Sequence, residues 1–119
     1  MGGVIVIFGG AGGIGEATAR LFVDKGANVV LLARSASQIE AIAKDIGNAA
    51  LAVTCDVSNY AEMKAAVAQA HAHFGSVDIL INNASAIQLT GTLRTEMKKY
   101  DLMHQVNARG TFLCAQACL

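Results

Sequence analysis

The sequence predicts an α/β fold in which helices cover both faces of a doubly wound parallel sheet. Short, nearly continuous aliphatic runs recur along the chain, as in strands that are buried on both faces. Segments of helical length, with apolar residues at a period of about 3.6, separate these runs. The regular alternation of strand and helix indicates parallel strands joined by right-handed crossovers. The 119 residues fit a single domain, residues 1–119.

The first aliphatic run, Val4–Phe8, leads directly into the glycine-rich turn Gly9–Gly15 and then into a helix. Gly9, Gly13 and Gly15 allow the backbone to turn sharply, to approach a ligand without a Cβ in the way, and to pack the helix against the strand. The N-terminus of that helix directs free N–H groups and a partial positive charge at a phosphate. The pattern therefore predicts a pyrophosphate site.

The first helix and the second βα unit follow from periodicity and capping signals. A helix that Gly26 ends is predicted by apolar residues at helical spacing, which are Ile14, Ala17, Leu21 and Phe22. Asn28–Ala33 predicts the second strand. Ser37–Glu40 has the form of a capping box at the start of the second helix, and Gly47 ends that helix.

The third βα unit and the fourth strand have equally clear signals. Ala50–Thr54 predicts the third strand, and either Ser58 or Asn59 caps the helix that follows it. One face of this helix, which runs up to Gly75, consists of Met63, Val67, Ala70 and Phe74. Val77–Ile81 predicts the fourth strand.

The C-terminal part of the chain is predicted to be a loop followed by helix. Ser85–Leu93 is polar and rich in turn residues, whereas Thr95–Leu119 is typical of one or two helices with an irregularity at Asn107–Gly110. Thr111–Leu119 is apolar almost all round. A helix of that kind is normally buried, so we expect it to pack against something that this sequence does not contain.

Composition and charge argue against several classes of partner. The nine basic and nine acidic side chains are balanced, and no basic cluster is present, so we expect no binding to nucleic acid. The longest apolar runs, such as Val29–Ala33, have the length of strands, so we expect no membrane segment. Met1 stands close to the first strand and leaves no room for a cleaved leader, which predicts a cytoplasmic location.

The three cysteines are Cys55, Cys114 and Cys118. Cys114 and Cys118 are one helical turn apart, a spacing at which two thiolates can share a metal ion. No histidine or further cysteine lies near them in the sequence to complete such a site. We therefore interpret all three as small apolar core residues and predict no metal site.

Arg34 and Asp56 each follow a predicted strand and are candidates for contact with a nucleotide. In a dinucleotide fold the end of the second strand meets the adenosine ribose, where a carboxylate suits NAD and a positive group suits the 2′-phosphate of NADP. Arg34 at this point favours NADP, although a solvated loop position is also compatible with it. Asp56 is suited either to accept from the adenine amino group or to serve as an acid ahead of the third helix.

Asn82-Asn83-Ala84-Ser85 follows the fourth strand at the carboxyl edge of the predicted sheet. Ligands of doubly wound folds bind at this edge. Adjacent asparagines at such a point can tie neighbouring loops together through their amides. A simple turn that ends the strand is the alternative interpretation.

Taken together, these residues resemble a family, the short-chain dehydrogenases/reductases. The motifs that carry the resemblance occur in the family's order and approximate spacing, and they are Gly9-x-x-x-Gly13-Ile14-Gly15, Asp56-Val57, Asn82-Asn83-Ala84 and Val106-Asn107. The segment from Asn82 to Phe112 is most similar to the branch called hydroxysteroid dehydrogenase-like.

The resemblance implies a Rossmann-type sheet with strand order 3-2-1-4, truncated before the later strands, and a cofactor site. The residues implied at the pyrophosphate are Gly9, Gly13, Ile14 and Gly15. Arg34 is implied at the ribose end of the cofactor, and Asp56 with Val57 at the adenine. Asn83 and Ala84 are implied at the ribose on the nicotinamide side.

The implied activity is hydride transfer between an alcohol and a ketone or aldehyde, with NADP as the cofactor and NAD as the alternative. Asn107 corresponds to the asparagine of the family's catalytic tetrad, which supports a proton relay and transfers nothing itself. The substrate is a small alcohol or carbonyl compound. The family also implies a homo-oligomer formed through the C-terminal helix.

The chain departs from the family pattern at several points. Phe8 stands where threonine is usual, and Ser85 replaces a glycine. The family's serine and Tyr-x-x-x-Lys are expected beyond Leu119, so the 119-residue chain is expected to be inactive alone. Tyr60 and Lys64 match that string, but they precede the fourth strand, and we interpret the match as a coincidence.

The histidines His71, His73 and His104 are interpreted as structural or solvated residues, since the first two cannot share one face of a helix. The alternative to an enzyme is a non-catalytic dinucleotide-binding module or an inactive fragment. Such a module keeps the glycine turn and Arg34 but needs no tetrad. A third possibility is a poorly folded chain, because the fourth strand is predicted to be a sheet edge.

Overall fold

The computed structural model describes residues 2–10, 12–87 and 89–119; Ala11, in the predicted glycine-rich turn, lies outside them. Its four-stranded sheet has the order β3-β2-β1-β4, and the paired strands are parallel. The strands are β1 (Val4–Phe8), β2 (Asn28–Ala33), β3 (Ala50–Thr54) and β4 (Ile79–Asn82). The predicted fold class and strand order are confirmed, with β3 and β4 as the edges.

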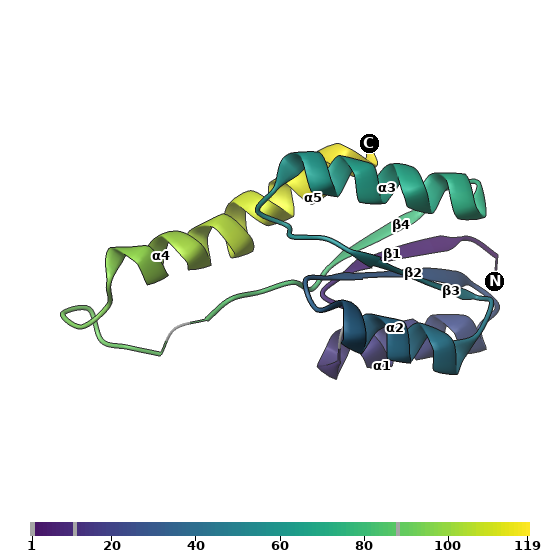
Figure 1. Cartoon of the computed structure of the whole chain (residues 1–119), viewed down its shortest axis with the longest axis horizontal. Coiled ribbons are helices and arrows are strands. Elements are labelled where there is room, and N and C mark those ends of the chain that lie inside the picture. The colour runs from purple at the N-terminus through teal and green to yellow at the C-terminus, as the bar shows by residue number, and fades with distance from the viewer. Residues whose placement is uncertain (1, 11, 88) are drawn as a thin grey trace.

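Helices cover both faces of the sheet (Figure 1). On one face lie α1 (Gly13–Asp24) and α2 (Ala36–Ile46), and on the other α3 (Tyr60–Phe74) and α5 (Thr111–Cys118). Helix α4 (Met97–His104) continues through the π-helix η1 (Gln105–Gly110) into α5. The irregularity predicted at Asn107–Gly110 is therefore a π-helical turn within one long helix.

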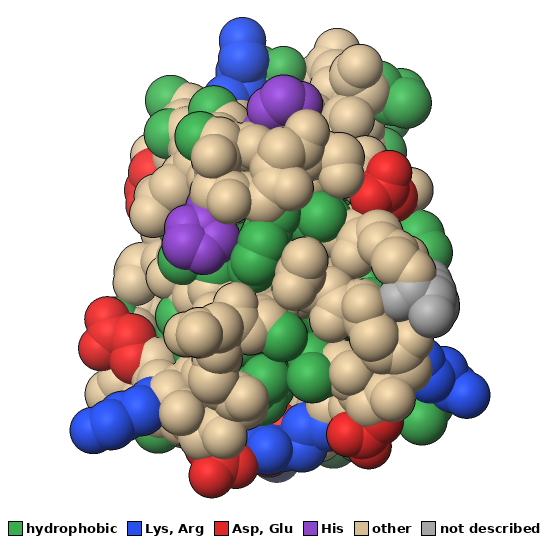
Figure 2. Space-filling model, turned by 90° about the vertical axis from the view of Figure 1, so that its right-hand side faces the viewer, with side chains coloured by type: hydrophobic (Ala, Val, Ile, Leu, Met, Phe, Trp, Pro, Cys, Tyr) green, Lys and Arg blue, Asp and Glu red, His purple; other side chains and the backbone are tan. Residues whose placement is uncertain are grey.

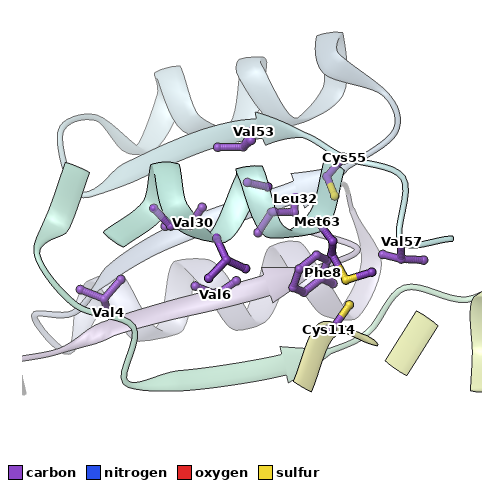
Figure 3. Packing of buried hydrophobic residues seen from close by; sticks show 13 residues of the cluster. Val4, Val6, Phe8, Val30, Leu32, Val53, Cys55, Val57, Met63 and Cys114 are labelled. Atoms are coloured by element: carbon purple, nitrogen blue, oxygen red, sulfur yellow. The ribbon is translucent and has the colours of Figure 1, made fainter. Parts of the chain in front are cut away.

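The core is divided between the two faces by the alternation of side chains along each strand. All of β1 is buried, but Val4, Val6 and Phe8 pack on the side of α3 and α5, whereas Ile5 and Ile7 pack on the side of α1 and α2. Figure 3 shows Phe8 directed towards sulfur-containing side chains of the first of these clusters. Burial on both faces explains why the strands read as continuous aliphatic runs.

The cysteines are free thiols, and the interpretation of Cys55 and Cys114 as core residues is confirmed. Cys118 is half-buried and packs against the same cluster. Burial raises the pKa of Cys55 to about 11 and that of Cys114 to about 12. Both thiols are therefore neutral at physiological pH.

The apolar face predicted for α1 is largely wrong. Ile14 is 76% exposed and Leu21 56% exposed, and Ala17 is also exposed. The side towards the sheet instead carries the small residues Gly15 and Ala19, followed by partly buried Phe22 and Val23. Small residues let the helix backbone approach the sheet, so the large aliphatic side chains are left on the outer side.

The capping box predicted at Ser37–Glu40 is also wrong. Helix α2 begins at Ala36 with Ser35 as its N-cap, and no side-chain capping bond is made there. Within this helix Ile39, which is 1% exposed, packs against the sheet. At α3 the prediction holds for Asn59, whose side chain accepts a hydrogen bond from the Glu62 amide at 3.1 Å.

At the C-terminus, α5 is buried on one side only. Cys114 is 1% exposed, with Leu113 and Ala117 packed against the same cluster, whereas Phe112 is 65% exposed. The sequence predicts burial of this helix against something outside the sequence. That expectation is wrong for one side of the helix, which packs against α3 and β4 of this chain. None of the described helices is long and apolar enough to cross a membrane.

Figure 2 views the molecule from the end where the N-terminus lies. Acidic and basic side chains are interspersed around this face, with hydrophobic side chains between them. This face presents no field of a single sign. The carboxyl ends of the strands, where the loops of the candidate site begin, lie at the opposite end of the sheet (Figure 1).

Candidate functional site

The loops that leave the carboxyl ends of all four strands line a cavity of about 390 Å³ that is open to solvent on one side. This is the edge at which doubly wound sheets bind ligands. Of the predicted site residues, the cavity lining contains Gly9, Arg34, Asp56, Val57, Asn83 and Ala84. The lining also contains residues for which the sequence predicts no role in the site, and these include Ser35, Gln38, Ala86 and Val106.

In the turn after β1, the backbone at Gly9 lies very close to the backbone of the loop after β4. Gly9 has φ +87°, and a Cβ built on it would lie 2.6 Å from the Ala84 amide nitrogen. The Gly9 amide donates to the Leu32 carbonyl at 2.7 Å, and the Asn83 side-chain amide donates to the Gly9 carbonyl at 3.0 Å. A Cβ on Gly15 would collide with that same Gly9 carbonyl. Both glycines are therefore required by space, and Gly9 by backbone conformation as well.

The N-terminus of α1 is open. Its N-cap, Gly12, has φ +112° and provides no side-chain capping bond, and Gly13 has φ +56°. A Cβ built on either glycine meets no other group within 4 Å. Gly13 and Ile14 do not line the cavity but begin the helix beside it. A helix N-terminus without a side-chain cap is suited to an anion, so the predicted pyrophosphate role of the turn stays a prediction.

Asp56 is fixed in a tight turn by Ser58. One carboxylate oxygen, Oδ1, accepts from the Ser58 amide at 2.9 Å and from the Ser58 hydroxyl at 2.7 Å. These hydrogen bonds, assisted by the charge of Arg34, hold the pKa of Asp56 below its usual range. Asp56 is therefore an anion that lines the cavity, and both bonds from Ser58 go to the same carboxylate oxygen, Oδ1. The turn is compatible with both roles considered for this residue.

Asn83 ties loops together as the sequence suggested. Its backbone amide donates to the Phe8 carbonyl at 2.9 Å, and its side chain binds the Gly9 turn. The end of β4 is thereby joined to the end of β1. Asn82 is the last residue of β4 and is exposed.

Asn107 lies in η1 and does not line the cavity, but its side chain holds a residue that does. Its Oδ1 accepts from the Ala86 amide at 2.9 Å, and its Nδ2 donates to the Ala86 carbonyl at 2.8 Å. This pair of bonds fixes the loop after β4. The partner is 21 residues away, and no local signal in the sequence could have identified it.

The remaining candidate acid–base residues lie elsewhere. The Lys64 ammonium is 5.6 Å from the centre of the Tyr60 ring on α3, and neither residue belongs to the described lining of the cavity. His71, His73 and His104 are exposed and do not belong to it either. The described lining contains no tyrosine, lysine or histidine.

Comparison with known proteins extends these observations. A family model described as short chain dehydrogenase matches residues 3–119. The chain is 44% identical over 128 residues to hydroxysteroid dehydrogenase-like protein 2 of Danio rerio and 42% identical over 132 residues to the protein of that name in Homo sapiens. These alignments cover 99% of this chain and 31% of each relative.

Solved structures give the same picture of the fold. The 3-ketoacyl-(acyl-carrier-protein) reductase from Brucella melitensis, complexed with NADH, is 37% identical with a TM-score of 0.92, and the match covers 96% of this chain and 48% of that one. A mutant short-chain dehydrogenase/reductase of Serratia marcescens is 37% identical with a TM-score of 0.90, covering 98% and 49%. The chain thus spans about a third of the first relatives and about half of these structures.

Proposed function

Because the chain belongs to the short-chain dehydrogenase family, we propose that it binds the nicotinamide dinucleotide of an oxidoreductase that transfers hydride between an alcohol and a ketone or aldehyde. The observation that carries this proposal is the cavity at the carboxyl edge, where Arg34, Asp56 and Asn83 converge beside the open N-terminus of α1. The related 3-ketoacyl reductase is complexed with NADH in its crystal structure, which supports the choice of cofactor.

The residues present fit such a cofactor. Gly12 and Gly13 provide an open cradle at a helix N-terminus, which suits the pyrophosphate. Asp56 and Val57 line the part of the cavity assigned to the adenine, and Ala84 the part assigned to the nicotinamide-side ribose. The bound nicotinamide would supply the hydride chemistry, and these residues would orient it.

Asn107 has a supporting role in this proposal. By binding both backbone groups of Ala86, it sets the position of the loop that closes the nicotinamide side of the cavity. The carbonyl of Asn107 itself accepts from the Thr111 hydroxyl at 3.0 Å. Acid–base work at the substrate requires a positioned group at the reacting oxygen, and the described cavity lining offers no tyrosine, lysine or histidine for it.

That composition of the lining favours a second candidate, a dinucleotide-binding module without catalysis of its own. Both candidates predict cofactor binding, but only the first predicts turnover. They are distinguished by supplying an alcohol and oxidised cofactor and following the formation of reduced cofactor by absorbance.

The proposed cofactor is NADP, with NAD as the alternative, because Arg34 lies at the end of β2 in the cavity lining. The test is titration of the purified chain with NADPH and with NADH, following cofactor fluorescence and thermal melting together. We expect saturable binding and a raised melting temperature. Arg34→Ala should weaken NADPH binding by about tenfold and NADH binding much less.

Arg94→Ala is the matched control, because Arg94 lies in the loop ahead of α4 and is not among the described lining residues. It should leave both affinities unchanged. A folded chain that binds neither cofactor would contradict the proposed function. Equal losses of NADPH and NADH in Arg34→Ala would contradict the preference for NADP.

A further inference from the structure

The π-helix η1 contacts both sides of the cavity through neighbouring residues. Asn107 binds Ala86 on the side of β4. Arg109 reaches the other side, where its Nη1 donates to the Ser58 carbonyl at 3.2 Å across 51 residues of sequence. Gly110, the next residue, is buried, and a Cβ on it would lie 3.1 Å from a Val57 methyl group. The segment after β3 is therefore packed directly against η1.

Ser58 is the point through which this contact reaches Asp56. The amide and hydroxyl of Ser58 both donate to Asp56 Oδ1, while its carbonyl accepts from Arg109. The Asn59 amide closes the same turn by donating to the Asp56 carbonyl at 3.0 Å. A shift of the Ser58 backbone would therefore move the carboxylate of Asp56 with it.

Arg109 does not act by touching a ligand. It is absent from the described cavity lining, although Val106 of the same π-helix is part of it. The positive charge that lowers the pKa of Asp56 comes from Arg34, at the end of β2. What Arg109 contributes is one long-range hydrogen bond to the backbone of the turn.

We propose that Arg109 is a positioning residue for the adenine end of the cavity: it fixes the Ser58 carbonyl and thereby the orientation of the Asp56 carboxylate. The proposal rests on the dinucleotide role given above. Arg109 therefore affects the binding of the adenine nucleotide part of the cofactor, and it does not affect the binding of the nicotinamide part. η1 then fixes the two ends of the cavity separately, through Asn107 at one and Arg109 at the other.

The test compares Arg109→Met, Arg109→Lys and the control Arg94→Met in the 119-residue chain. Amide hydrogen exchange is measured at Ser58 and Asn59, and binding is measured for NADPH, adenosine diphosphate ribose and nicotinamide mononucleotide. Arg109→Met should speed exchange at both amides and weaken the two adenine-containing ligands by about fivefold. Nicotinamide mononucleotide should bind as before. Arg109→Lys should restore most of the affinity, since a single donor is needed.

The outcomes separate this inference from the proposed function. Unchanged exchange at Ser58 and Asn59 in Arg109→Met would overturn the role of Arg109. Equal weakening of the adenine and nicotinamide ligands would also overturn it, because a general loss of structure acts on both. Failure of the unaltered chain to bind NADPH, with exchange at Ser58 still dependent on Arg109, would instead overturn the proposed function.

Discussion

Strand β1 and helix α4 are held in place in opposite ways. Every residue of β1 is buried between helices on both faces of the sheet, whereas α4 has no buried residue and extends away from the body of the molecule (Figure 1). Apolar burial therefore fixes the strand ends from which the cavity loops start. The segments around Ala86 and Ser58, at the two sides of the cavity, are held instead by a few hydrogen bonds from η1.

This difference matters for the candidate site because each kind of support has its own energy scale. A buried aliphatic side chain stabilises a fold by several kcal/mol, whereas one hydrogen bond has a net effect of about 1 kcal/mol. The glycine turn follows the buried strand β1, whereas the loop after β4 is held by the hydrogen bonds of η1. We therefore expect substitutions in the sheet to unfold the chain and those in η1 to alter the site locally.

The largest expected effect comes from a matched pair of leucines. Leu32 in β2 is 0% exposed, and Leu93 in the loop ahead of α4 is 101% exposed. Leu32→Ala should lower the free energy of unfolding by about 3 to 5 kcal/mol, because it leaves a cavity in the core. Leu93→Ala should change it by less than about 0.5 kcal/mol. Urea denaturation measures both, and similar losses would contradict the comparison.

A second pair tests the glycine turn against the loop. Gly15→Ala places a Cβ against the Gly9 carbonyl, whereas a Cβ on Gly91 meets nothing within 4 Å. We expect Gly15→Ala to lower the free energy of unfolding by about 2 kcal/mol and to abolish cofactor binding. Gly91→Ala should be neutral within about 0.5 kcal/mol. Thermal melting with and without NADPH checks both, and retained binding in Gly15→Ala would contradict the role of the turn.

The sheet could be predicted from the sequence because burial on both faces leaves a direct signal. β2 and β3 occur at the predicted bounds, Asn28–Ala33 and Ala50–Thr54. β4 begins at Ile79, two residues later than predicted, since Val77 and Asp78 precede its ladder with β1. Two parallel neighbours hold β1, but only one holds the edge strand β4.

The helices and the rim of the site could not be predicted as well. The periodicity of α1 predicts a face that contains Ile14 and Leu21, but the helix approaches the sheet through Gly15 and Ala19, and glycine and alanine give a weaker signal than large aliphatic residues. The contacts of Asn107 with Ala86 and of Arg109 with Ser58 join residues far apart in sequence. Both contacts form only when the chain has folded so that η1 lies beside the loops after β3 and β4. A local sequence pattern therefore predicts neither contact.

A smaller effect is expected at Asn107, and it should be local. Asn107→Ala removes both bonds to Ala86, while Asn107→Asp keeps an acceptor for the Ala86 amide but loses the donor to its carbonyl. Each lost bond is worth about 1 kcal/mol, so exchange of the Ala86 amide should rise by about fivefold in Asn107→Ala and less in Asn107→Asp. Amides of β1 should be unaffected. Equal acceleration in β1 and at Ala86 would mean that η1 supports the whole fold.

The smallest expected effect is a pH dependence that comes from Asp56. Hydrogen bonds from Ser58, with the charge of Arg34, lower the pKa of this carboxyl in the folded chain. A group of this kind stabilises the fold above its unfolded pKa of about 3.9, and the contribution is lost as the pH falls through the lower folded value.

The difference in unfolding free energy between the unaltered chain and Asp56→Asn should therefore shrink as the pH falls from about 6 to about 2. Asp101→Asn on α4, outside the described cavity lining, is the control for removal of a surface carboxylate. Urea denaturation over this pH range provides the measurement. A difference that stays constant, or grows towards low pH, would mean that the Ser58 turn does not favour the ionised form of Asp56. The hydrogen bonds from Ser58 to Asp56 would then contribute nothing measurable to the stability of the folded chain.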